Sequence, residues 1–269
     1  ARRRSRYDPM ILSRIAKALK DQNWLAVGIE FIIVIAGVVI GFQVTAWNED
    51  RLSAIRGTEL TERLVADLRD EQWRVAATRN SLSDVAASGE RTLAVLEGEA
   101  EISDEALVIG AYRATQYFWS GLIRGTYDEI VAGGEIGLIR NTALRDNAVA
   151  YYGGPPTVLF NELGEAPFRN AIRERIDPEL HRDLVASCTN DFKQVGDYAA
   201  IEAILDFPCR IEGHDAAIAR RATELRGSQG LTNPLRRRVI EAAQQSTSIQ
   251  GYGRFLETGL AAYPGPDTT

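Results

Sequence analysis

The strongest hydrophobic pattern in the sequence lies between Trp24 and Trp47. Its central part, FIIVIAGVVIGF at residues 31–42, contains no charge and lacks the polar face that a soluble helix repeats every three or four residues. A helix of these 24 residues is about 36 Å long, which exceeds the roughly 30 Å of hydrocarbon in a bilayer. The pattern therefore predicts a single transmembrane helix over residues 24–47 rather than the core helix of a soluble protein.

Charged residues on the two sides of this segment predict its orientation. Residues 1–20 contain seven basic side chains and one acidic side chain, whereas the twenty residues after Trp47 contain three basic and five acidic ones. Because basic flanks stay on the cytoplasmic side, we expect a cytoplasmic N-terminus in the bacterial inner membrane and a periplasmic main domain. Trp24 and Trp47 are the predicted anchors at the two membrane interfaces. The apolar stretch is too long for a cleavable signal peptide.

A stripe of small residues runs along the predicted span. Gly37 and Gly41 lie one helical turn apart, and Thr45 and Glu30 fall on roughly the same stripe. Small residues let a second helix approach closely, so we predict a helix-packing interface at these four positions. The Glu30 carboxylate either extends to the membrane boundary or pairs with a partner helix or a cofactor-bearing subunit.

The N-terminal flank has a pattern of its own. Residues 10–21, MILSRIAKALKD, place four apolar side chains on one helical stripe and the basic side chains away from it. This predicts an interfacial amphipathic helix, and a solvated basic tail is the alternative. The expected parts of the chain are a cytoplasmic tail with this helix (1–23), the transmembrane helix (24–47), a periplasmic helical domain (48–263) and a C-terminal tail (264–269).

Beyond the span the pattern is helical almost throughout. Apolar residues recur at spacings of four, seven and eleven, and residues 10–154 contain no proline. Arg69, Asp70 and Glu71 lie off this stripe, so we expect them on the solvent face. We predict one long helix, or two nearly collinear helices that break near Gly89. The recurring apolar positions are Leu60, Leu64, Leu68, Val75, Leu82, Leu93 and Leu96.

Capping residues predict the helices that follow. Ser103 is the expected N-cap of a helix over residues 103–119. Thr126 is the expected cap of a short helix that ends at Gly133 and Gly134.

The rest of the chain also favours helices. Asn141 or Thr142 is predicted to cap a helix that runs to Tyr152. Pro234 is expected in the first turn of the last helix. Aromatic residues concentrated between positions 117 and 127 favour a packed core over a ligand cage. The whole pattern predicts an all-α fold, a helical bundle after one transmembrane helix, with further helices over residues 155–176, 198–205, 214–226 and 234–263.

Two motifs give the first 155 residues a family resemblance. The span ends in the pattern Q-V-x-x-W-N-E, and residues 126–145 follow T-Y-x-E-L-x-x-x-G-x-L-x-L-I-x-N-x-x-L-R, with Ile130 and Ile136 in place of leucine. With these motifs the chain resembles a family of uncharacterised bacterial single-span membrane proteins. The resemblance implies a single-span topology and a helical outer domain, and it implies no activity. The matching residues are Gln43, Val44, Trp47, Asn48 and Glu49, then Thr126, Tyr127, Glu129, Gly134, Ile136, Leu138, Ile139, Asn141, Leu144 and Arg145.

The only two cysteines, Cys188 and Cys209, both follow the span. They have neither metal-ligand nor C-x-x-C spacing, so in an oxidising compartment they predict one disulfide. Two free buried thiols are the alternative. Closing a loop of this size contributes on the order of 3 kcal/mol in the chain-entropy model.

Charge and motifs narrow the possible functions. Residues from Asn48 onward carry 24 basic and 34 acidic side chains, a balance of -10, which disfavours nucleic-acid binding. The sequence contains no G-x-S-x-G, H-E-x-x-H, P-loop or G-x-G-x-x-G motif, and only two histidines. We therefore expect no enzymatic activity, no metal and no cofactor.

Binding is the function that these patterns favour. We expect an accessory or scaffold subunit of a larger bacterial inner-membrane complex, whose partners are the lipid bilayer and other integral membrane subunits or a second copy of the chain. The alternative is a membrane-anchored periplasmic ligand-binding or sensor protein that acts through a partner. The short cytoplasmic part favours the first interpretation, because it contains no signalling domain.

Overall fold

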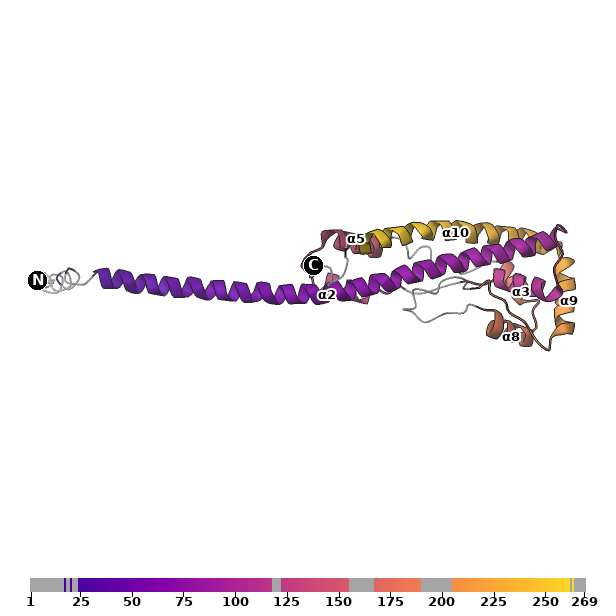
Figure 1. Cartoon of the computed structure of the whole chain (residues 1–269), viewed down its shortest axis with the longest axis horizontal. Helices are drawn as coiled ribbons and strands as arrows, with labels where there is room; N and C mark the ends of the chain where they lie inside the picture. Colours follow the sequence, from indigo (N-terminus) through magenta and orange to yellow (C-terminus); the bar gives the residue numbers. More distant parts are fainter. Residues whose placement is uncertain are drawn as a thin grey trace, which may run out of the picture. The chain divides into compact units, whose positions relative to one another are not determined.

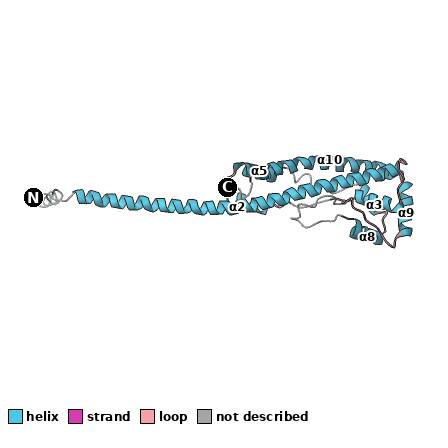
Figure 2. Ribbon diagram, in the orientation of Figure 1, coloured by secondary structure: helices cyan, strands magenta, loops and turns pink. Residues whose placement is uncertain are grey.

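The structure is a computed structural model of the 269-residue chain that describes residues 17, 20, 24–117, 122–154, 167–189, 205–261 and 263. Every element in this part is a helix, and no strand occurs among these residues (Figure 2). The predicted all-α fold is therefore confirmed for the described part. The helices are α2 (Trp24–Leu96), α3 (Asp104–Ala114), α4 (Gly125–Ala132), η1 (Ile136–Leu138), α5 (Thr142–Gly153), α7 (Pro167–Arg173), α8 (Pro178–Cys188), α9 (Asp215–Arg226) and α10 (Gln229–Ala261).

Several predictions concern residues that the structure does not describe. Of the predicted interfacial helix, the structure describes only Lys17 and Lys20, which are helical and exposed. Residues 198–204 of the helix predicted near 198–205 and the C-terminal tail at 264–269 lie outside the described residues, as does the side chain of Trp24. Among the aromatic residues, Phe118 and Trp119 lie outside them too.

The chain forms two compact units, Ala1–Arg56 and Gly57–Thr269. In the first unit, every residue from Leu25 to Ser53 is helical and exposed. Within the described residues, α2 is the one helix that is long and apolar enough to cross a membrane, and its apolar window is not buried by any other part of the chain. The predicted span is thus a candidate membrane helix with a bare apolar surface.

The second unit is organised around an antiparallel helix pair. Figure 1 shows α10 alongside the later part of α2. The direction follows from the contacts, because the Ser246 hydroxyl donates to the Arg79 carbonyl (3.2 Å) and a Cβ atom added at Gly89 would lie 2.6 Å from Val239. Helix α2 continues through Gly89, so this glycine is a point of close packing and not a break.

Two apolar clusters fill the second unit. The first joins the end of α2 to α3, α7, α8, α9 and the start of α10, with Leu107, Phe168 and Leu184 among its fully buried members. The second joins the earlier turns of α2 to α4, α5 and the later turns of α10, with Leu64 and Tyr151 near its centre. The predicted apolar stripe of α2 is confirmed as core for Leu60, Leu64, Leu68, Val75 and Leu82, which are at most 4% exposed. Leu93 and Leu96, its last two members, are partly buried and pack against the first cluster.

Helix ends test the capping predictions. Ser103 and Asn141 are N-caps as expected, because their side chains accept hydrogen bonds from the backbone N–H groups of Ala106 and Leu144. Thr126 is not a cap. Helix α4 begins at Gly125 without a side-chain cap of its own, and the Thr126 N–H group donates instead to Asp67 of α2 (3.3 Å).

Other boundaries differ from the predicted ones. Helix α3 ends at Ala114, several residues before the predicted end, because the Arg238 side chain binds the Ala114 and Gln116 carbonyl groups there. Pro234 lies inside α10, which begins at Gln229. Helix α8 was not predicted. Gly133 and Gly134 end α4 as expected, and Gly134 adopts φ +68°, which favours glycine.

A glycine substitution tests the close approach between α2 and η1. A Cβ atom at Gly57 would lie 2.6 Å from the backbone oxygen of Leu138, which cannot move independently of its turn. We expect Gly57→Ala to lower the free energy of unfolding by about 1–2 kcal/mol, since overpacking outweighs the better helix propensity of alanine. Thermal unfolding of the full chain in detergent, followed by circular dichroism, measures the change.

Gly251 of α10 provides the matched control. No atom lies within 4 Å of its Cβ position, so Gly251→Ala should raise stability by up to about 1 kcal/mol through propensity alone. Equal shifts in both variants would contradict the packing argument.

Candidate functional site

The predicted packing stripe lies on the exposed helix of the first unit. Apart from their chain neighbours and the backbone of their own helix, Gly37 and Gly41 have no atom within 4 Å of their Cβ positions, and Glu30 and Thr45 are exposed. The Thr45 hydroxyl donates to the Gly41 carbonyl (3.0 Å), so its hydrogen bond stays within the helix. Trp47 is 66% exposed. The stripe is therefore an open surface that another helix could reach.

A buried carboxylate lies inside the second unit, where the sequence predicted a solvent face. Glu71 is 2% exposed, which corrects that prediction, although Arg69 is exposed as expected. The two carboxylate oxygens of Glu71 accept hydrogen bonds of 2.6 Å from the Ile123 N–H group and the Tyr151 hydroxyl. Tyr152 donates to the Ile123 carbonyl (2.9 Å), so the residues that lead into α4 are held from both sides.

Burial dominates the electrostatics of this network. It raises the pKa of the Glu71 carboxyl above its ordinary value, against the opposite effect of the hydrogen bonds from Ile123 and Tyr151. Burial and the Glu71 charge raise the pKa of Tyr151, and burial raises that of Tyr152. Tyr151 therefore remains a hydrogen-bond donor to the carboxylate over the whole physiological range.

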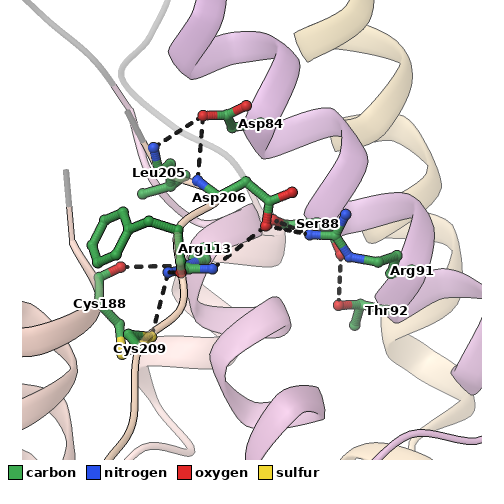
Figure 3. Close-up of polar contacts among 10 residues, drawn as sticks. Asp84, Ser88, Arg91, Thr92, Arg113, Cys188, Leu205, Asp206 and Cys209 are labelled. Carbon is green, nitrogen blue, oxygen red and sulfur yellow. Dashed lines mark hydrogen bonds and ion pairs between the residues drawn. A yellow bond between two sulfur atoms is a disulfide. The ribbon is translucent and has the colours of Figure 1, made fainter. Parts of the chain in front are cut away.

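A second buried charge, Arg113 of α3, lies against the cysteine pair (Figure 3). Cys188 and Cys209 are joined as a disulfide with 5.5 Å between their Cα atoms, as predicted. Arg113 donates to the Cys188 carbonyl (3.4 Å), the Phe207 carbonyl (2.6 Å) and the Cys209 sulfur (3.3 Å). Burial lowers the pKa of Arg113, and the nearby Asp206 carboxylate opposes this effect. The guanidinium group thus binds both ends of the disulfide-closed loop.

The segment at residues 205–206 is also held by α2. The Asp84 carboxylate accepts from the N–H groups of Leu205 (2.9 Å) and Asp206 (3.3 Å), and Asp206 pairs with Arg91 at 2.8 Å (Figure 3). Asp206 also lies 3.5 Å from Arg113. Asp206 is thus shared by both arginines, and this cluster fastens the loop to α2 and α3.

A third buried charge, Arg238, packs against part of the aromatic region. Arg238 of α10 is 2% exposed and lies over the Tyr117 ring, 4.1 Å from its centroid, and the Arg169 guanidinium lies 4.9 Å from the same centroid. Tyr127 stacks on Tyr152, with 4.8 Å between ring centroids. These two aromatic residues pack against protein groups, which agrees with the predicted core role.

The described residues offer little for metal or acid–base chemistry. They contain no group of three or more His, Cys, Asp or Glu side chains that could hold a metal ion. His214 forms a 2.6 Å contact with Asp183, and His181 lies edge-on to Tyr112. Each histidine is therefore engaged separately in packing or pairing.

Comparison with known proteins adds no relative. No protein-family model, no curated protein and no solved structure matches the chain. The resemblance to bacterial single-span proteins therefore stays a prediction that rests on the two motifs.

The buried carboxylate makes stability depend on pH. Because folding raises the pKa of Glu71, the folded state holds this proton more tightly, and stability falls as pH rises from about 4.5 through the raised pKa. In Glu71→Gln this contribution should be absent, so the variant should gain stability relative to the wild type over the same interval. Thermal unfolding in detergent between about pH 4.5 and about pH 8 measures the difference.

Glu62→Gln is the matched control, because Glu62 is an exposed acid on the same helix. It should keep the pH profile of the wild type. A Glu71→Gln profile parallel to that of the wild type would contradict the assignment of Glu71 as the titrating group.

Proposed function

We propose that the protein is a non-enzymatic accessory or scaffold subunit of a larger bacterial inner-membrane complex. It docks on integral membrane subunits, or on a second copy of itself, through the helix at residues 24–47. The acidic helical domain supplies a further contact surface in the periplasm, and the basic N-terminus lies in the cytoplasm.

The observation that carries this proposal is the bare apolar surface of the first unit. Leu25, Phe31 and Phe42 are at least 66% exposed, although side chains of this kind are normally buried in a soluble protein. A lipid bilayer can cover such a helix, and the open stripe at Gly37 and Gly41 leaves room for a neighbouring helix.

The contacts of the second unit support a scaffold role. Its buried charges Glu71, Arg113 and Arg238 bind backbone groups of the protein itself, so they serve the fold and not a substrate. A helical domain held together by such internal contacts is suited to present surfaces to partner proteins.

Glycine variants in the span test the docking proposal. Leucine at Gly37 or Gly41 would hold a neighbouring helix several ångströms further away and remove the close contact that drives association between helices in lipid. We expect Gly37→Leu and Gly41→Leu to lose association with partner subunits or with a second copy. Insertion should persist, since leucine is more favourable in the membrane than glycine. Native gels and copurification in mild detergent measure both properties.

Val38→Leu, which changes size on the flank of the stripe, is the control and should associate like the wild type. Unchanged association in both glycine variants would show that the span is only an anchor.

The cysteine pair tests the proposed orientation. Because Cys188 and Cys209 are the only cysteines, a maleimide that cannot cross membranes reports on them alone. In intact spheroplasts we expect labelling of the partly exposed Cys209 only after treatment with an impermeant reductant. Cys209→Ser is the labelling control.

Two results would contradict this prediction. Labelling without reductant would mean that the thiols are free. Labelling that requires lysis of the spheroplasts would place the domain in the cytoplasm.

A further inference from the structure

A cavity of about 520 Å³ lies between α2 and α10 in the second unit. We call it the α2/α10 groove and define it by six of its lining residues. Its volume is in the range of pockets that bind small molecules. The defining residues are Arg69, Trp73, Val75, Arg79, Arg254 and Glu257.

The groove has a buried floor and an exposed rim. Trp73 and Val75 of the floor are 7% and 4% exposed, whereas Arg69, Arg254 and Glu257 on the rim are exposed. A molecule that enters from the rim would therefore meet charged groups first and an indole ring and an aliphatic side chain below them.

The charge of the groove is opposite in sign to the net charge of the chain from residue 48 onward. Three guanidinium groups and one carboxylate give it a net positive charge, although the chain from residue 48 onward has a balance of -10. Within the described part of the chain, the guanidinium groups of Arg69 and Arg254 form no hydrogen bond or ion pair. The Arg79 side chain donates only to the neighbouring Asn80 amide oxygen (3.1 and 3.2 Å). No carboxylate among the described residues forms an ion pair with these three cations.

The indole N–H group of Trp73 is buried and has no hydrogen-bond partner among the described residues. A buried donor without an acceptor is unfavourable by about 1–3 kcal/mol and is uncommon in native proteins. The groove therefore has two guanidinium groups without a partner in the described part of the chain, those of Arg69 and Arg254, and a third, that of Arg79, that binds only an amide oxygen.

We propose that the α2/α10 groove binds a small organic oxyanion. Its carboxylate or phosphate group lies among the guanidinium groups of Arg69, Arg79 and Arg254, which suit oxyanions by their paired N–H donors. Its apolar body packs against Trp73 and Val75. The proposal concerns the outer domain alone and does not depend on docking through the span.

Three probe molecules distinguish recognition of the anionic group from recognition of the apolar body. Phenyl phosphate carries both an anion and an apolar ring, benzyl alcohol only the ring, and inorganic phosphate only the anion. Isothermal titration calorimetry of the full chain in uncharged detergent should show saturable binding of phenyl phosphate, and at least about tenfold weaker binding of each of the other two probes.

Arginine variants then locate the site. Arg254→Gln should weaken phenyl phosphate binding by about tenfold, and the double variant Arg69→Gln/Arg254→Gln should abolish it. Both side chains are exposed, so circular dichroism should show an unchanged fold. Arg220→Gln removes the same charge from the exposed surface of α9 and should bind like the wild type.

Three outcomes would overturn the proposal. Failure of phenyl phosphate to saturate the protein at concentrations up to about 10 mM would show that the groove does not bind it. Benzyl alcohol that binds as tightly as phenyl phosphate would identify an apolar pocket without anion selectivity. Equal weakening of phenyl phosphate binding in Arg220→Gln and Arg254→Gln would show that binding depends only on the overall charge of the protein.

Discussion

The seam between α2 and α10 is the constraint on which the rest of the second unit depends. The contacts of α10 recur every seven residues, at Val239, Ser246 and Gly253, and they meet Gly89, Arg79 and Val75 of α2. Seven residues are about two helical turns, so one face of α10 follows α2. The same two helices also carry buried charges, Glu71 on α2 and Arg238 on α10.

The buried charges of the two helices hold irregular segments of the chain. A buried charge is unfavourable unless hydrogen bonds satisfy it. Arg238 is satisfied by carbonyl groups at the end of α3, and Glu71 by the Tyr151 hydroxyl and by the Ile123 N–H group just before α4. Both helices therefore bind the described ends of the connection between α3 and α4, and Tyr152 also binds Ile123 there. Arg113 extends this principle to the disulfide-closed loop.

Features that depend on neighbouring residues could be predicted from the sequence, whereas contacts between residues far apart in the sequence could not. Ser103 and Asn141 cap helices through N–H groups three residues away, and a single pair of cysteines has only one possible partner arrangement. Thr126 failed as a cap because the acceptor at that helix start is Asp67, 59 residues earlier. Glu71 was placed on the solvent face because of its charge, although it stands seven residues after Leu64 and four before Val75. The spacing can be read from the sequence, but the backbone N–H group of Ile123 that binds Glu71 cannot.

The arginines of the second unit include two pairs with different surroundings. Arg113 and Arg238 are buried, and their N–H groups donate to backbone carbonyl groups, so their charge is used to hold the fold together. Arg69 and Arg254 are exposed at the rim of a cavity and have no such acceptors in the described part of the chain. The first pair is engaged by the protein itself, whereas the proposed binding of an anion in the groove rests on the second pair. A change at Arg69 or Arg254 would therefore alter this binding without removing a contact that the fold of the second unit uses.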